Sequence, residues 1–181
     1  LFLCFALPFF IAWVSYAVLG LYPFGDKQLL AHDEWHQYYP FFVSFREKLL
    51  DGGSLQYSWD MGMGTGYASL FAYYLASPLY LLSVLVPASW LREYFAFLTV
   101  LKLSCAGLFF GMFLRTAFRK ADFSLPFFAL MYAFCAWAGG YAWNIIWLDT
   151  FALLPLLVAG TVSLLREGRF RLYVAALALS L

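Results

Sequence analysis

An uncharged apolar run passes abruptly into polar sequence near the start of the chain, where residues 1–40 read LFLCFALPFFIAWVSYAVLGLYPFGDKQLLAHDEWHQYYP. The run Leu1–Tyr22 is long enough to cross the hydrocarbon core of a bilayer, which is about 30 Å thick. Pro23 and Gly25 end this run. We therefore expect a first transmembrane helix, followed by a long external loop over residues 23–69.

The composition is that of a membrane protein. Of the 181 residues, 65% are hydrophobic and only 12% are charged, whereas a soluble domain has about a quarter charged residues. The net charge of +1 argues against a nucleic-acid-binding module. The three cysteines lie in apolar runs without a CxxC pair, so they carry no metal or redox signature. The composition predicts an all-α fold, a polytopic transmembrane helical bundle.

Further apolar segments predict the rest of the bundle. We expect spans over 94–114, 123–143, 151–165 and 170–181. Segment 70–86 is apolar but short and is interrupted by Pro78, so it either crosses the membrane or is re-entrant or interfacial. We expect one transmembrane domain, of which this chain is the N-terminal part within a longer polytopic protein.

The first loop is expected to contain short interfacial helices. Pro40 suits the first turn of a helix that runs through Lys48. Phe42, Phe45 and Leu49 would share one side of this helix, and we expect that side to dip into the lipid.

The positions of the basic residues favour one topology. Two clusters, Arg115–Lys120 and Arg166–Arg171, are separated by two predicted helices and so lie on the same side. If segment 70–86 crosses the membrane, both clusters are external, against the excess of Lys and Arg that marks cytoplasmic loops. If segment 70–86 does not cross, both clusters are cytoplasmic. The first loop and the turn that holds Asn144 and Asp149 are then external, and we favour this arrangement.

Asp33 and Glu34 are the first candidate catalytic residues. A carboxylate at an interface can bind a divalent cation, accept a proton from a substrate hydroxyl, or simply be solvated. Nearby aromatic side chains, among them Trp35 and Tyr38, would exclude water and raise a carboxylate pKa toward neutrality, as a general base requires.

The histidines beside these acids offer a second interpretation. His32 and His36 could contribute to a zinc site, but the sequence has no HExxH motif and no third histidine. We therefore take His36, with Gln37 and Tyr38, as candidate substrate-binding residues.

A glycine-rich motif follows in the same loop. Gly62, Gly64 and Gly66 alternate with larger residues, and such glycines let backbone amides approach an anion. The motif lacks the strand-before, helix-after context of a dinucleotide site and has no Walker lysine, so a flexible loop before segment 70–86 is the alternative. Trp59 and Asp60 join the three glycines as candidate substrate contacts.

Later in the chain, Lys102, Asn144 and Asp149 are candidates. Lys102 lies inside a predicted span, where it either reaches the interface or meets a lipid phosphate. Asp149 either caps the following helix or joins Asp33 at the external face as a second catalytic carboxylate. Asn144 is a candidate substrate-binding residue in the same turn. Any divalent cation would be held by Asp33 and Asp149.

Three stretches together resemble the bacterial YfhO family. They are Asp33-Glu34-Trp35-His36-Gln37-Tyr38-Tyr39-Pro40-Phe41, then Trp59-Asp60-Met61-Gly62-Met63-Gly64-Thr65-Gly66, and Asn144–Asp149 with Leu154-Pro155. The resemblance covers nearly the whole chain and implies the architecture of GT-C glycosyltransferases. In such enzymes an acidic residue of the first external loop acts as base or metal partner, and Asp33 matches that position. A second acidic residue follows in the next external loop, where Asp149 fits.

The resemblance also implies an activity. The expected reaction transfers a sugar from a polyprenyl-phosphate donor to a cell-envelope acceptor, such as a teichoic acid, at the extracytoplasmic face. The phosphate charge would be met by the amides of Gly62–Gly66, Lys102, Arg46 or a divalent ion. A transporter or flippase of lipid-linked sugars and a non-catalytic accessory subunit remain the alternatives.

Overall fold

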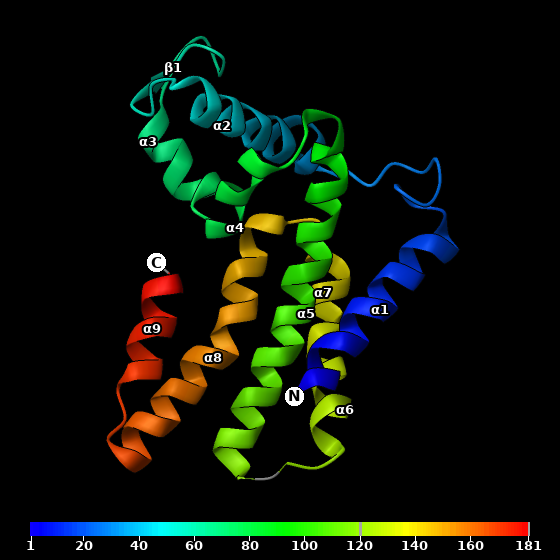
Figure 1. The fold of residues 1–181 in the computed structure, drawn as a ribbon, viewed down its shortest axis with the longest axis vertical. Helices are drawn as coiled ribbons and strands as arrows, with labels where there is room; N and C mark the ends of the chain where they lie inside the picture. The colour runs from blue at the N-terminus through cyan, green and yellow to red at the C-terminus, as the bar shows by residue number, and fades with distance from the viewer. Residues whose placement is uncertain (120, 181) are drawn as a thin grey trace.

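The computed structural model describes residues 1–119 and 121–180, which are mostly helical with very little strand (Figure 1). Within these residues, three helices are long and apolar enough to cross a membrane, and a bent pair of shorter helices makes a fourth apolar segment. The three spanning elements are α1 (Phe2–Leu19), α5 (Leu91–Phe118, preceded by the turn η4, Ala88–Trp90) and α8 (Ile145–Glu167). The predicted all-α, polytopic membrane bundle is confirmed.

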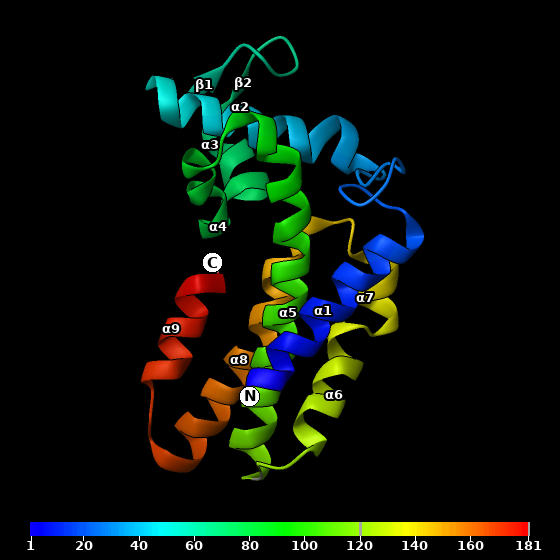
Figure 2. The ribbon, with the colours of Figure 1, turned by 45° about the vertical axis from the view of Figure 1, so that its right-hand side comes forward.

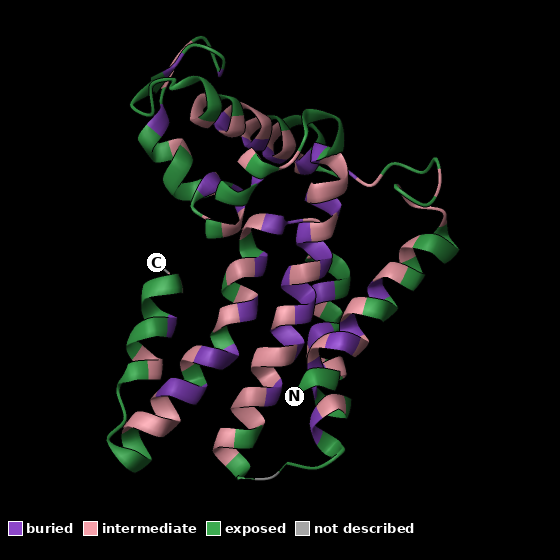
Figure 3. Cartoon of the chain, viewed as in Figure 1, coloured by how far each residue is buried: buried purple, intermediate pink, exposed green. Residues whose placement is uncertain are grey.

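Helix α5 is the centre of the bundle and packs against α1, α6 (Ser124–Ala133) and α8. The contact with α1 is close because α5 carries glycines there. A Cβ at Gly107 would lie 2.5 Å from the Cys4 carbonyl oxygen, and one at Gly111 would lie 2.7 Å from the Cys4 Sγ. Small residues allow this approach between helices in lipid. The outward faces of α1, α6 and α9 (Arg171–Ser180) are exposed and largely apolar, as lipid-facing surfaces are (Figure 3).

A helical cap, residues 22–90, covers one end of the bundle (Figures 1 and 2). It begins with the π-helical turn η1 (Glu34–Tyr38) and α2 (Tyr39–Asp51), which Gly52 ends in the left-handed conformation. A small hairpin follows, with β1 (Tyr57–Ser58) antiparallel to β2 (Thr65–Gly66).

The cap continues as a bent segment, Tyr67–Leu85. Its first limb is α3 (Tyr67–Leu70) with η2 (Phe71–Leu75), and its second limb is α4 (Pro78–Leu81) with η3 (Leu82–Leu85). The limbs meet at 108° across Ala76 and Ser77. Both limbs lie at the cap end of the bundle (Figures 1 and 2).

Helix α2 differs from the expectation that its aromatic side faces lipid. Phe42 and Phe45 are fully buried, and their rings pack at tilted angles against Tyr80 and Phe71 of the bent segment, respectively. Arg46 fixes the same contact by donating to the carbonyl oxygens of Ser83 and Val86 at 3.0 and 2.7 Å. The apolar side of α2 therefore holds the bent segment in place, and Arg46 serves this contact.

Two predicted spans have different boundaries in the structure. Residues 123–143 form two short helices, α6 and α7 (Ala136–Tyr141), because the helix breaks at Phe134 and Cys135. Helix α8 begins at Ile145, so Asp149 lies inside this helix and neither caps it nor occupies the connecting turn. At the end of the bundle opposite the cap, α5 and α8 finish with Arg115 and Arg166 in their last turns.

Candidate functional site

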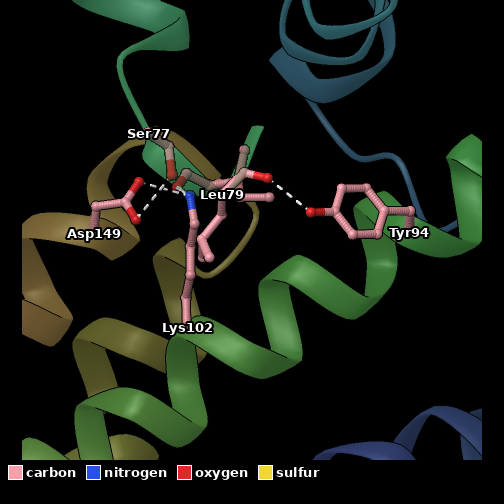
Figure 4. A network of polar contacts seen from close by, with 6 residues as sticks. Ser77, Leu79, Tyr94, Lys102 and Asp149 are labelled. Carbon is pink, nitrogen blue, oxygen red and sulfur yellow. Dashed lines mark hydrogen bonds and ion pairs between the residues drawn. The ribbon is translucent and has the colours of Figure 1, made fainter. Parts of the chain in front are cut away.

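A buried ion pair joins α5 to α8 where the bent segment reaches the bundle (Figure 4). Lys102 Nζ lies 2.7 Å from Asp149 Oδ2 and donates to the carbonyl oxygen of Ile145 at 3.1 Å. Ser77 Oγ donates to Asp149 Oδ1 at 3.2 Å. Only 2% of the Lys102 side chain is exposed, against 26% for Asp149. The pair therefore satisfies a charge that would be costly to bury alone.

Local sequence explains how these groups meet. Ser77 has extended backbone before Pro78, which begins α4, so the chain turns sharply and places Ser77 at the tip of the bent segment. Tyr94 secures the tip from α5 by donating its hydroxyl to the Leu79 carbonyl oxygen at 2.7 Å (Figure 4). The Tyr80 ring lies beneath the lysine, with Nζ 4.9 Å from the ring centroid.

A pocket of about 230 Å³ opens beside Asp149. It is bounded by the bent segment, α8 and the end of α9. Aromatic and hydroxyl side chains make up much of its lining: Tyr73, Tyr74, Ser77, Tyr80, Trp147, Thr150 and Ser180. Aromatic faces with hydroxyls and one carboxylate suit a polar, ring-shaped ligand. None of these aromatic and hydroxyl residues was predicted from the sequence, although the tyrosines on both sides of the Ser77–Pro78 break were a usable signal.

Asp33 directly precedes η1 in the cap and is not among the residues that line this pocket. Its Oδ1 is 3.3 Å from His36 Nε2, and both side chains are substantially exposed. The next residues reach the pocket wall, because Tyr74 donates its hydroxyl to Gln37 Oε1 at 3.4 Å and the Tyr38 and Tyr74 rings are 5.7 Å apart. Burial, aided by the nearby Asp33 charge, raises the pKa of Tyr38 to about 12. Asp33, His36, Gln37 and Tyr38 thus form one group beside the tyrosines of the pocket.

Glu34 differs from Asp33 although the two are adjacent. Its side chain is buried, and Oε2 accepts a hydrogen bond from the Ala31 amide at 3.1 Å. Burial raises the pKa of Glu34 to about 8, and the Ala31 hydrogen bond only partly offsets this. Glu34 is therefore mostly protonated at neutral pH. It is not one of the residues that line the pocket.

The glycine-rich motif lies away from the ion pair. Gly62 and Gly64 form the tip of the β1–β2 hairpin at the outer end of the cap, and Figures 1 and 2 show α2 and α3 between this hairpin and α8. Trp59 is highly exposed, and Asp60 accepts from Ser58 Oγ at 3.1 Å within the hairpin. Trp59, Asp60, Gly62, Gly64 and Gly66 are thus not brought to the Asp149 pocket.

Asn144 is buried just before α8, and its Oδ1 has no hydrogen-bond partner among the described residues. It does not line the pocket beside Asp149. The structure therefore places Asn144 near the start of α8 without giving it a ligand-facing position.

The arrangement of the carboxylates does not favour a divalent cation. Within residues 1–119 and 121–180, no three His, Cys, Asp or Glu side chains group closely enough to hold a metal ion. Both oxygens of Asp149 already accept hydrogen bonds, one from a lysine whose charge would repel a cation. No catalytic step is therefore assigned to a metal at Asp33 and Asp149.

Comparison with known proteins agrees with the membrane architecture. The family described as "Bacterial membrane protein YfhO" matches residues 4–181. No curated protein and no solved structure is significantly similar to the chain. The matched region includes the helical bundle, the cap and the Lys102–Asp149 pair, and so the chain belongs to the YfhO family of bacterial multi-pass membrane proteins.

Proposed function

We propose that this protein is a membrane glycosyltransferase that moves a sugar from a polyprenyl-phosphate donor to a cell-envelope acceptor such as a teichoic acid. The observation that carries the proposal is Asp149, a carboxylate held by Lys102 and Ser77 on the wall of a pocket rich in tyrosine. The pocket lies where the cap meets the membrane helices, and in this proposal the lipid-linked sugar is presented there. Membership of the YfhO family supports a protein of the GT-C-like kind.

The two aspartates have different roles in this proposal. Asp149 is engaged on both oxygens, so it orients the sugar through its remaining lone pairs. Among the described residues, His36 is the salt-bridge partner of Asp33. The Asp33 side chain is partly exposed, and in this proposal it accepts the proton. Glu34, which is buried and mostly protonated at neutral pH, takes no direct part in this proposal.

The reaction balances without another reactant. An acceptor hydroxyl oxygen attacks the anomeric carbon, and the bond between that carbon and the phosphate oxygen breaks. The electron pair of this bond leaves with the carrier phosphate, and the hydroxyl proton passes to Asp33. General-base catalysis of this kind contributes about 10²–10⁴-fold to the rate.

We also propose that the cap is extracytoplasmic. The opposite end of the bundle carries basic residues at the ends of α5 and α8, in the loop after α8 and at the start of α9: Arg115, Arg119, Arg166, Arg169 and Arg171. An excess of Arg and Lys near helix ends marks the cytoplasmic side. The pocket beside Asp149 would then receive a donor presented at the outer face.

The test is transfer by the purified protein in nanodiscs, with a radiolabelled polyprenyl-phosphate sugar and an isolated teichoic acid. Asp33→Asn should lower turnover about 10²–10⁴-fold while donor binding persists, because an amide cannot accept the proton. Asp26→Asn, an exposed aspartate of the same loop, is the matched control.

The rival functions give different results in the same assay. Movement of the intact donor across a liposome membrane without bond cleavage would identify a flippase. Transfer that is unaffected by Asp33→Asn, or that needs a second protein, would identify an accessory subunit. Either result would overturn the proposed catalysis.

A further inference from the structure

A second pocket also borders the Lys102–Asp149 pair. It also has a volume of about 230 Å³ and shares Pro78, Asp149 and Leu179 with the pocket rich in tyrosine. Its remaining lining is Lys102 with apolar side chains: Leu79, Cys105, Phe109, Ala152 and Leu153. One pocket is therefore polar and the other apolar, and the ion pair stands at their junction.

The apolar pocket lies between two membrane-spanning helices. Cys105 and Phe109 come from α5, and Ala152 and Leu153 come from α8. Its volume is below the ~300–1,000 Å³ of drug-sized ligand sites. A segment of one hydrocarbon chain fits this volume better than the two chains of a diacyl lipid.

Lys102 can receive an anion at this junction. Its ammonium group has three donor hydrogens, and two acceptors, Asp149 Oδ2 and the Ile145 carbonyl oxygen, already lie within hydrogen-bond distance. A phosphate at the mouth of the apolar pocket would compete with Asp149 for the same ammonium group. Since Ser77 still holds Asp149 Oδ1, the carboxylate would stay at the pocket wall after losing the lysine.

We infer that Lys102 exchanges Asp149 for the phosphate of a single-chain isoprenyl phosphate, whose chain lies in the pocket formed by Leu79, Cys105, Phe109 and Leu153. The inference rests on the proposed function, because it treats this ligand as the donor carrier. In the resting protein the lysine and the aspartate neutralise each other. Once the lysine binds the phosphate, Asp149 is released to accept hydroxyls in the pocket rich in tyrosine, so donor binding itself completes the sugar site.

If this exchange occurs, removal of the Asp149 charge should strengthen ligand binding, and removal of the Lys102 charge should weaken it. With farnesyl phosphate as the probe and phosphatidylcholine nanodiscs as the membrane, Asp149→Asn should bind about 3–10-fold more tightly than the unchanged protein, because the lysine no longer has a competing anion. Lys102→Met should weaken binding at least about 10-fold, because the phosphate loses its cation. Lys27→Met, an exposed lysine of the first loop, should leave affinity unchanged.

The position of the isoprenyl chain of the ligand is tested separately. Leu153→Trp should fill the apolar pocket and weaken farnesyl phosphate binding, whereas Leu154→Trp, on the adjacent exposed position, should not. Farnesol and inorganic phosphate should each bind far more weakly than farnesyl phosphate, since each lacks one half of the ligand. Competition by phosphatidic acid included in the nanodiscs would overturn the single-chain assignment.

A double variant serves as the control for misfolding of the single variants. Lys102→Met/Asp149→Leu removes both charges and leaves neither one unpaired, so it should fold and still lose farnesyl phosphate binding. Retained binding by this variant, or weaker or unchanged binding by Asp149→Asn, would overturn the exchange. Binding is measured without turnover, so an absence of sugar transfer with the predicted binding pattern rejects the proposed function and leaves the exchange standing.

Discussion

At the scale of single residues, Glu34 and Asp33 show how adjacent carboxyl groups acquire different chemistry. Asp33 is partly exposed beside His36, whereas Glu34 is buried. The sequence predicted the aromatic surroundings that raise a carboxyl pKa, but it assigned them to both acids. Which of two neighbours turns inward depends on the π-helical turn η1, and no local pattern in the sequence indicated this turn.

Glu34 should make stability depend on pH. Its pKa is raised from 4.5 to about 8 in the folded protein, so the folded state binds more protons than the unfolded state between these values. Stability should therefore be highest below about pH 4.5 with respect to this group and should fall as pH rises toward 8.

Glu34→Gln should remove this dependence. At pH 9 it should raise the unfolding free energy by on the order of a few kcal/mol, and the melting temperature should rise with it. Thermal unfolding in detergent at pH 5, 7 and 9 measures it, with Glu47→Gln on α2 as the control. Equal pH dependence of the Glu34→Gln variant and the unchanged protein would contradict the prediction.

At the scale of elements, the contact between α1 and α5 depends on small residues. A Cβ at Gly107 would meet the Cys4 carbonyl oxygen at 2.5 Å, and backbone atoms cannot move away cheaply. Gly107→Ala should force the helices apart and destabilise the protein by about 1–3 kcal/mol. Gly139→Ala in α7 meets open space and should be neutral or slightly stabilising. Unfolding midpoints of the two variants in the same detergent compare them directly, and equal midpoints would show that α1 is loosely packed.

The apolar segments of the sequence predicted most of the long helices, because hydropathy over a span is a local property. The segment 123–143 is apolar throughout, yet it breaks into α6 and α7 at Phe134 and Cys135. The start of α8 at Ile145 is also earlier than the charge of Asp149 suggested. Lys102 bonds to Asp149 and to the Ile145 carbonyl at this point, and such tertiary contacts are not visible in a single segment.

At the scale of the whole molecule, the bundle separates the cap from the basic termini of α5 and α8 (Figure 2). The positions of the Arg and Lys residues alone predicted that the ends of α5 and α8 lie at the same end of the bundle. They did not predict that Ser77 reaches Asp149, because that contact joins residues far apart in the sequence through the bend of the Tyr67–Leu85 segment.

The proposed orientation can be measured with single cysteines in a variant whose three native cysteines are replaced by alanine. Met63→Cys lies at the highly exposed hairpin tip of the cap, and Phe123→Cys lies at the exposed start of α6 at the other end. In intact cells an impermeant maleimide should label position 63 and not position 123, which should react only after permeabilisation. The reverse pattern would place the cap in the cytoplasm.

The separation of Lys102 and Asp149 along the chain has a consequence for biosynthesis. At ~5–20 residues per second the ribosome delivers the aspartate several seconds after the lysine, so α5 enters the bilayer with its cation uncompensated. A central lysine costs about 2.5–3.5 kcal/mol in translocon-mediated insertion, and the apolar remainder of α5 must supply that energy unaided. Nascent chains truncated before α8 should still integrate. In the longer chain, Lys102 meets its counter-ion only when α8 arrives.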